Sequence, residues 1–83
     1  MEFLNEDDAA VGALLLKNRV DFTYYPDPIH PRLGIRAPFV IEARKEIIGF
    51  WDEATPYDAL LAESQGYQLV LVRKEEPIEE QVA

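Results

Sequence analysis

Few side chains in this sequence have the types and spacing that catalysis requires. His30 is the single histidine, and Asp27 is the nearest acid along the chain. One imidazole and one carboxylate form neither a catalytic triad nor a closed zinc site, which needs about four ligands. The acid pairs Asp7-Asp8 and Glu75-Glu76 are sequence neighbours, and neighbouring positions on a helix do not face a common site. We therefore expect no catalytic residue, no metal, no cofactor and no enzymatic activity; an enzyme using His30 would need a carboxylate in the same pocket.

Composition narrows the class of protein further. The chain has 83 residues, no cysteine and a formal net charge of -8. Without thiols it has no disulfide, no thiolate metal site and no dithiol redox chemistry. Its charge disfavours nucleic acid and anionic membrane surfaces as partners. Apolar runs such as Leu69 to Val72 are too short to span a bilayer, and the acidic start does not resemble a signal peptide. We expect a soluble, cytoplasmic protein.

The first half of the chain predicts a helix, a strand and a loop. Asn5 followed by three acids is typical of a helix start, and apolar residues three and four apart extend this helix over about 6–17. Residues 20–25 alternate apolar and polar side chains and predict a strand. Residues 26–34 contain three prolines and predict a loop.

The second half predicts a hairpin, a helix and a last strand. The hairpin pairs residues 38–43 with 46–51, and a helix capped by Thr55 runs to about Gln65. The run 68–73 is apolar without alternation, so we expect a central strand with both faces covered. The whole chain, 1–83, should form one domain, with residues 75–83 as a frayed acidic tail.

This order of elements, with two local motifs, resembles the glutaredoxin branch of the thioredoxin-like fold. Arg36-Ala37-Pro38 is similar to the Thr-Val-Pro that precedes one strand of that family, and Gly49-Phe50-Trp51-Asp52 is similar to its Gly-Gly-aromatic-Asp exit. The resemblance covers about residues 8–65. It implies an α/β (α+β) fold: a four-stranded mixed sheet with two helices on one face, in the order α-β-β-β-α-β.

Two features depart from that family. No strand with a cysteine motif precedes the first helix, and the proline-rich loop replaces the second helix. A circular permutation would explain the first departure if the last strand took the central position, giving the sheet order 20–25, 68–73, 38–43, 46–51. The second departure would leave one sheet face thinly covered.

The resemblance also implies where a ligand would bind. In the family the proline is usually cis and its preceding backbone pairs with an extended peptide, so Arg36, Ala37 and Pro38 are candidates for a binding edge; the alternative is a proline that simply starts a strand. Trp51 and Asp52 are either a rim that stacks on a partner or a half-buried tryptophan followed by a helix-leading acid.

These observations give two leading hypotheses for function. The first is a non-catalytic, glutaredoxin-like binding or assembly module of unknown partner, incompetent in redox chemistry and, because of its thinly covered sheet face, a homodimer. The alternative is a small acidic protein, of a phage or regulatory type, that binds a basic protein surface. Strong salt dependence of binding would favour the second hypothesis.

Overall fold

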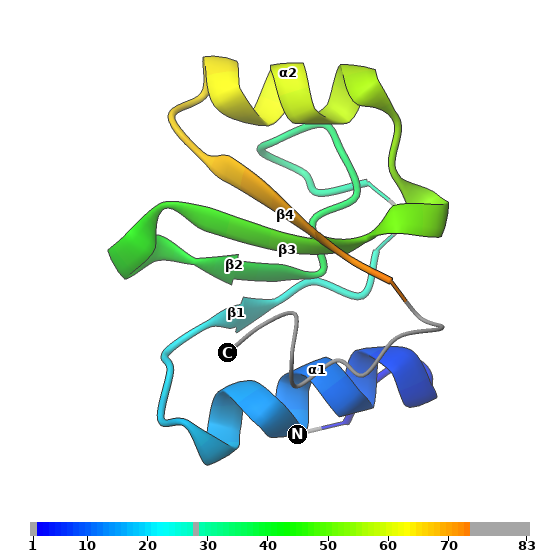
Figure 1. Cartoon of the computed structure of the whole chain (residues 1–83), viewed down its shortest axis with the longest axis vertical. Helices are drawn as coiled ribbons and strands as arrows, with labels where there is room; N and C mark the ends of the chain where they lie inside the picture. Colours follow the sequence, from blue (N-terminus) through cyan, green and yellow to red (C-terminus); the bar gives the residue numbers. More distant parts are fainter. Residues whose placement is uncertain (1, 28, 74–83) are drawn as a thin grey trace.

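The computed structural model of the chain describes residues 2–27 and 29–73. The predicted tail, 75–83, lies outside these residues. Within them the predicted order α-β-β-β-α-β is confirmed (Figure 1). The elements are α1 (Glu6–Lys17), β1 (Thr23–Tyr24), β2 (Phe39–Ile41), the 3₁₀ turn η1 (Glu42–Arg44), β3 (Glu46–Phe50), the 3₁₀ turn η2 (Trp51–Glu53), α2 (Pro56–Ser64) and β4 (Gln68–Val72).

Both helices begin at the residues that the sequence predicts. The Asn5 side chain accepts a hydrogen bond from the backbone N–H of Asp8 at 2.8 Å, as an N-cap should. Thr55 and Asp58 form a reciprocal capping box, and Pro56 takes the first helical position, where its missing N–H removes no hydrogen bond. Local side-chain chemistry therefore fixes both helix starts.

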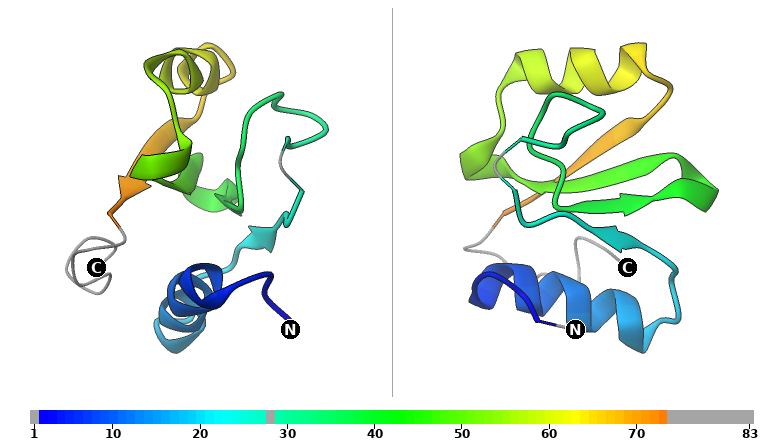
Figure 2. Two further views of the ribbon diagram at one scale, coloured as in Figure 1. Left: turned by 90° about the vertical axis from the view of Figure 1, so that its right-hand side faces the viewer. Right: turned by 180° about the vertical axis from the view of Figure 1, so that it is seen from behind.

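The four strands form one mixed sheet in the order β1-β2-β3-β4. The first two pairings are antiparallel and β3 pairs with β4 in parallel. The prediction of a central strand at 68–73, and with it the permuted sheet order, is wrong, because β4 lies at the sheet margin (Figure 2). Its apolar run reflects cover on both faces: Val72 belongs to one core cluster and Leu69 packs against the other. Cover on two faces does not require a neighbour on each edge.

The helices lie on opposite faces of the sheet, so the prediction that they share one face is also wrong (Figures 1 and 2). On the α1 face, Val11 and Leu15 pack with the β-strand residues Phe39 and Ile48. On the other face, Ala62 of α2 belongs to the second core cluster. Crossovers between parallel strands are almost always right-handed, so the side on which the chain re-enters the sheet decides which face the helix covers. Here the chain re-enters the sheet on the side of β3 that faces away from β2, so α2 covers the face opposite to α1.

The proline-rich loop covers the sheet face that the sequence suggested would be bare. Leu33, Ile35 and Ala37 are buried together with Val40 of β2 and Ile47 of β3. The premise of the expected homodimer, an exposed sheet face, is therefore absent from the described structure, and dimerisation itself stays a prediction. The described residues contain no cis peptide bond, so the expected cis geometry before Pro38 is wrong.

Neither helix within residues 2–27 and 29–73 is long and apolar enough to cross a membrane.

Candidate binding surface

The predicted binding edge divides into a buried part and an exposed part. Ala37 and Pro38 are buried, and the Pro38 carbonyl accepts a hydrogen bond from the Tyr25 backbone N–H at 2.8 Å. The chain itself therefore occupies this part of the edge. Trp51 and Asp52 are exposed in the η2 turn, which Arg36 joins through an ion pair described next. Ligand binding at these five positions stays a prediction.

A buried polar cluster links α1, β1 and η2. Asp8 is fully buried, and its Oδ2 accepts a hydrogen bond from the Tyr24 hydroxyl at 2.6 Å. The Arg36 guanidinium lies 3.8 Å from the same oxygen and 3.2 Å from the Glu53 carboxylate. Burial, reinforced by the hydrogen bond to Asp8, raises the pKa of Tyr24, so the phenol stays protonated as a donor. This cluster holds the fold together, and the other Asp8 oxygen, Oδ1, has no hydrogen-bond partner among the described residues.

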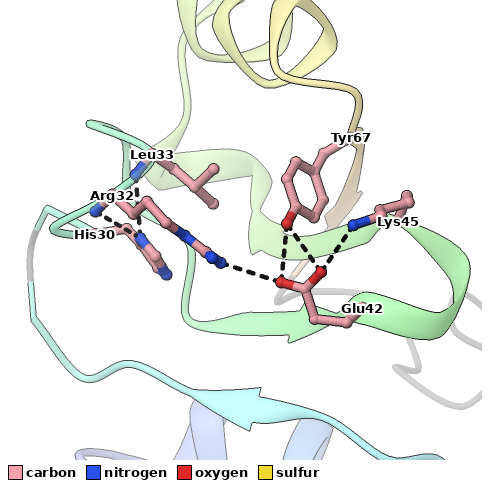
Figure 3. Close-up of polar contacts among 6 residues, drawn as sticks. All are labelled: His30, Arg32, Leu33, Glu42, Lys45 and Tyr67. Atoms are coloured by element: carbon pink, nitrogen blue, oxygen red, sulfur yellow. Dashed lines mark hydrogen bonds and ion pairs between the residues drawn. The ribbon is translucent and has the colours of Figure 1, made fainter.

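A second polar cluster surrounds Glu42 at the start of the β2–β3 turn (Figure 3). Its carboxylate accepts hydrogen bonds from the Tyr67 hydroxyl at 2.8 and 3.0 Å, from Lys45 at 3.1 Å and from Arg32 at 3.1 Å. The hydrogen bond from Tyr67, followed by that from Lys45, lowers the pKa of Glu42. A carboxylate that is stabilised in its ionised form is a poor proton donor at neutral pH. The cluster instead joins the loop, the turn and Tyr67, the residue that precedes β4.

His30 lies beside this cluster but is buried in the proline-rich loop, with 1% of its surface exposed. Its Nδ1 accepts hydrogen bonds from the backbone N–H groups of Arg32 and Leu33, both at 3.1 Å (Figure 3). The neutral ring therefore carries its proton on Nε2, which is buried and has no partner among the described residues. Burial lowers the pKa of His30. With Nδ1 engaged, this imidazole has no lone pair to offer a substrate, and no described group of histidine and acidic residues could hold a metal ion.

Half of the exposed large apolar side chains of the described residues lie on η2 and α2. Trp51, Tyr57 and Leu60 are three of the six large apolar side chains that are exposed in the described structure. Trp51 is 54% exposed, and the Arg73 guanidinium lies 4.7 Å from the centre of its indole ring. Stacked tryptophan and arginine side chains are common at the centres of protein interfaces.

Trp51 forms one wall of a groove between α2 and β4. This groove has a volume of about 350 Å³ and is lined by Trp51, Ala54, Thr55, Pro56, Ala59 and Leu71. A second groove, of about 630 Å³, also contacts Ala59 and extends to the other end of β4; it is lined by Arg44, Lys45, Ala59, Glu63, Gly66, Tyr67, Gln68 and Leu69. The two grooves together follow β4 along its whole length.

The backbone of β4 has one edge that no described strand pairs with. The Gln68 N–H donates to the Lys45 carbonyl at 2.8 Å, on the β3 side. Backbone groups alternate in direction along a strand, so Val70 and Val72 also pair toward β3, whereas Leu69 and Leu71 direct N–H and C=O outward. We call this outer edge, with its neighbouring apolar side chains, the β4 surface; it consists of Trp51, Pro56, Ala59, Leu69 and Leu71. We include the exposed Leu60, because it lies one helical turn after Pro56 on α2.

Comparisons of this chain with protein-family models, with curated proteins and with solved structures found no match. The class that the fold defines is therefore an α+β protein with a four-stranded mixed sheet. The sequence suggested Trp51 and Asp52 as candidates, and their role in binding stays a prediction. It did not suggest the β4 edge near Trp51, because that strand was expected in the middle of the sheet. The spacing of Pro56, Ala59 and Leu60, three and four residues apart, could have revealed the shared helix face.

Proposed function

We propose that this protein is a non-catalytic protein-binding module and that its binding site is the β4 surface. The observation that carries the proposal is the exposed Trp51, stacked with Arg73, in an apolar groove beside a strand edge with outward backbone groups. A partner that covered this surface would remove a large indole from water and satisfy backbone donors and acceptors at the same time. The module is redox-incompetent because it has no cysteine.

The polar clusters support a scaffold role for the rest of the molecule. Tyr24 and Arg36 both contact Asp8, and Glu42 is already hydrogen-bonded to three side chains of this chain. These groups hold the sheet, the loop and α1 in place and leave the β4 surface as an apolar region open to a partner. The relationship to glutaredoxins, as a scaffold that lost its thiols, remains a hypothesis based on the two motifs at 36–38 and 49–52 and is not needed for this proposal.

A library of random peptides displayed on phage tests the proposal. The library is selected on the wild-type chain and on two variants, Leu60→Asp and Leu16→Asp. Leu60 and Leu16 are both exposed helix leucines, 65% and 54% exposed, but only Leu60 lies on the β4 surface. Each new aspartate adds the same charge on a helix, so the pair separates a local effect from a general effect on charge or folding.

We expect peptides that bind the wild type and Leu16→Asp but not Leu60→Asp or Trp51→Ala. Binding of these peptides should change the fluorescence of Trp51, the only tryptophan in the chain. Selected peptides that bind all variants equally would place the site elsewhere and contradict the proposal, as would a library that yields no binder.

A further inference from the structure

We infer that the β4 surface takes an extended, positively charged segment of a partner protein, which pairs with β4 as a fifth strand. This inference rests on the proposed function and specifies the chemistry of the partner. Three independent observations carry it: the direction of the β4 backbone groups, the length of the groove, and the distribution of charge over residues 46–72.

The backbone of β4 supplies the main-chain half of such a pairing. Leu69 and Leu71 direct their N–H and C=O groups away from β3, and both side chains are only partly buried. Strand addition satisfies these groups through main-chain hydrogen bonds, and the pockets next to the strand select the side chains of the incoming segment. The groove at Trp51 and Leu71 is such a pocket and is mostly apolar.

The length of the binding region favours an extended segment over a compact ligand. β4 has five residues. At about 3.3 Å per residue this corresponds to roughly 17 Å of strand. The two grooves that meet at Ala59 accompany it from Gln68 at one end to Trp51 at the other. A segment of five or more extended residues would contact both grooves.

The charge of this region favours a cationic segment. Between residues 46 and 72 the sequence contains no lysine, arginine or histidine, and it contains five acids: Glu46, Asp52, Glu53, Asp58 and Glu63. Of these acids Glu63 lines the second groove, and it forms no ion pair within the described residues. Arg44 and Lys45 line the same groove. The cations at the hairpin tip each face an acid of the same turn, with Lys45 at 3.1 Å from Glu42 and Arg44 at 3.9 Å from Glu46. A lysine or arginine side chain of a partner would therefore meet Glu63, whose carboxylate has no ion-pair partner among the described residues.

A second copy of the chain fits this surface less well. Two β4 edges could pair about a twofold axis, but each copy carries a formal charge of -8 and would bring the same acidic region to the interface. We therefore assign the surface to a different chain and treat self-pairing as an outcome that would overturn the inference.

Synthetic peptides test the inference on the full-length protein. The probe is an eight-residue peptide of alternating lysine and valine, blocked at both ends, and binding is followed by the fluorescence of Trp51. One control peptide replaces every lysine by glutamate and keeps the valines. A second control keeps the lysine-valine sequence but carries a methyl group on every backbone nitrogen, so it has the same charge without main-chain donors.

We expect only the unmethylated lysine-valine peptide to bind, and its affinity to fall several-fold between about 0.05 and 0.5 M salt, because salt screens exposed charges. Leu71→Pro removes one outward N–H without removing a hydrogen bond to β3, whereas Leu71→Ala keeps that N–H and loses only side-chain contacts. One hydrogen bond contributes about 1 kcal/mol, so Leu71→Pro should bind about fivefold more weakly than Leu71→Ala. Circular dichroism of both variants checks that they fold.

The outcomes separate this inference from the proposed function. Equal binding of the methylated and unmethylated peptides, or preferred binding of the glutamate peptide, would overturn the fifth-strand inference. If the displayed library still yields Leu60-dependent peptides that are anionic or helical, the proposed function stands and only the inference fails. A dimer in analytical ultracentrifugation that Leu71→Pro dissociates would also overturn the inference, because a second copy would then occupy the edge.

Discussion

Replacement of Tyr24 by phenylalanine should destabilise the fold far more than the loss of one hydroxyl group at the surface. The hydroxyl donates to the buried Asp8 carboxylate at 2.6 Å and accepts from the Leu4 backbone N–H at 2.9 Å. Asp8 Oδ1 already lacks a hydrogen-bond partner among residues 2–27 and 29–73, and Arg36 lies 3.8 Å from Oδ2. Tyr24→Phe would therefore remove the one side-chain hydrogen bond that this buried carboxylate accepts from the described part of the chain.

The expected magnitude follows from the charge of the acceptor. Hydrogen bonds to charged groups contribute about 1.5–3 kcal/mol, and burial prevents water from replacing the lost donor. We expect a loss of about 2–3 kcal/mol in the free energy of unfolding. For a domain of this size, 1 kcal/mol shifts the melting temperature by about 4–8 °C, so Tyr24→Phe should melt about 10–20 °C below the wild type.

Tyr57→Phe is the matched control. Tyr57 is 67% exposed and its side chain makes no hydrogen bond within the described residues, so loss of its hydroxyl should change stability by less than about 0.5 kcal/mol. Thermal unfolding followed by circular dichroism measures both variants. In an Asp8→Asn background the effect of Tyr24→Phe should shrink, because the charged acceptor is gone. Equal melting temperatures for Tyr24→Phe and Tyr57→Phe would refute the assignment of Asp8 and Tyr24 as a stabilising pair.

Three further predictions concern the loop, the turn and α2. The pKa of His30 is lowered in the fold, so its contribution to stability is complete above its unfolded pKa of about 6.5 and is lost as the pH falls below that value. His30→Asn keeps an acceptor for the two amides but does not titrate, so it should reduce the difference between the urea midpoints measured at about pH 7.5 and 5.5. An unchanged difference would contradict this role of His30. Tyr67→Phe should raise the pKa of Glu42 in a carboxyl NMR titration, because the hydrogen bond from Tyr67 is the largest cause of its lowering; an unchanged pKa would show that Lys45 and Arg32 suffice. Gly66→Ala should lower the free energy of unfolding by about 1 kcal/mol in a denaturation experiment, because Gly66 has a φ of 86° and a left-handed backbone strains alanine. Gly66→Asn should lower it less. Equal stability of the wild type and both variants would argue against a left-handed residue at this position.

The features that the sequence predicts well are those decided by neighbouring residues. Asn5 and Thr55 cap the helices at the expected positions, and the hairpin turns at Lys45, whose φ of 52° is the left-handed conformation of a tight turn. The strand expected at 20–25 is shorter, Thr23–Tyr24. Its first residue, Val20, donates its N–H to Leu15 at the end of α1 and so belongs to the helix exit.

The features that the sequence does not reveal depend on the whole topology. An apolar run such as 68–73 indicates that two faces are covered, but a marginal strand between two layers satisfies that condition as well as a central one. The wrong position of β4 also led to the wrong face for α2, because α2 lies in the crossover from β3 to β4. Glu42 and Tyr67, which are 25 residues apart in the chain, become neighbours only through tertiary packing, which no local pattern encodes.

Amide hydrogen exchange along β4, measured by NMR with and without the lysine-valine peptide, tests the central claim most directly. In the protein alone, the amides of Val70 and Val72 should exchange slowly and those of Leu69 and Leu71 rapidly, because only the first pair donates toward β3. Saturation with the peptide should slow exchange at Leu69 and Leu71. Slow exchange at Leu71 in the protein alone, or no change on saturation, would contradict the account of an open β4 edge that binds a fifth strand.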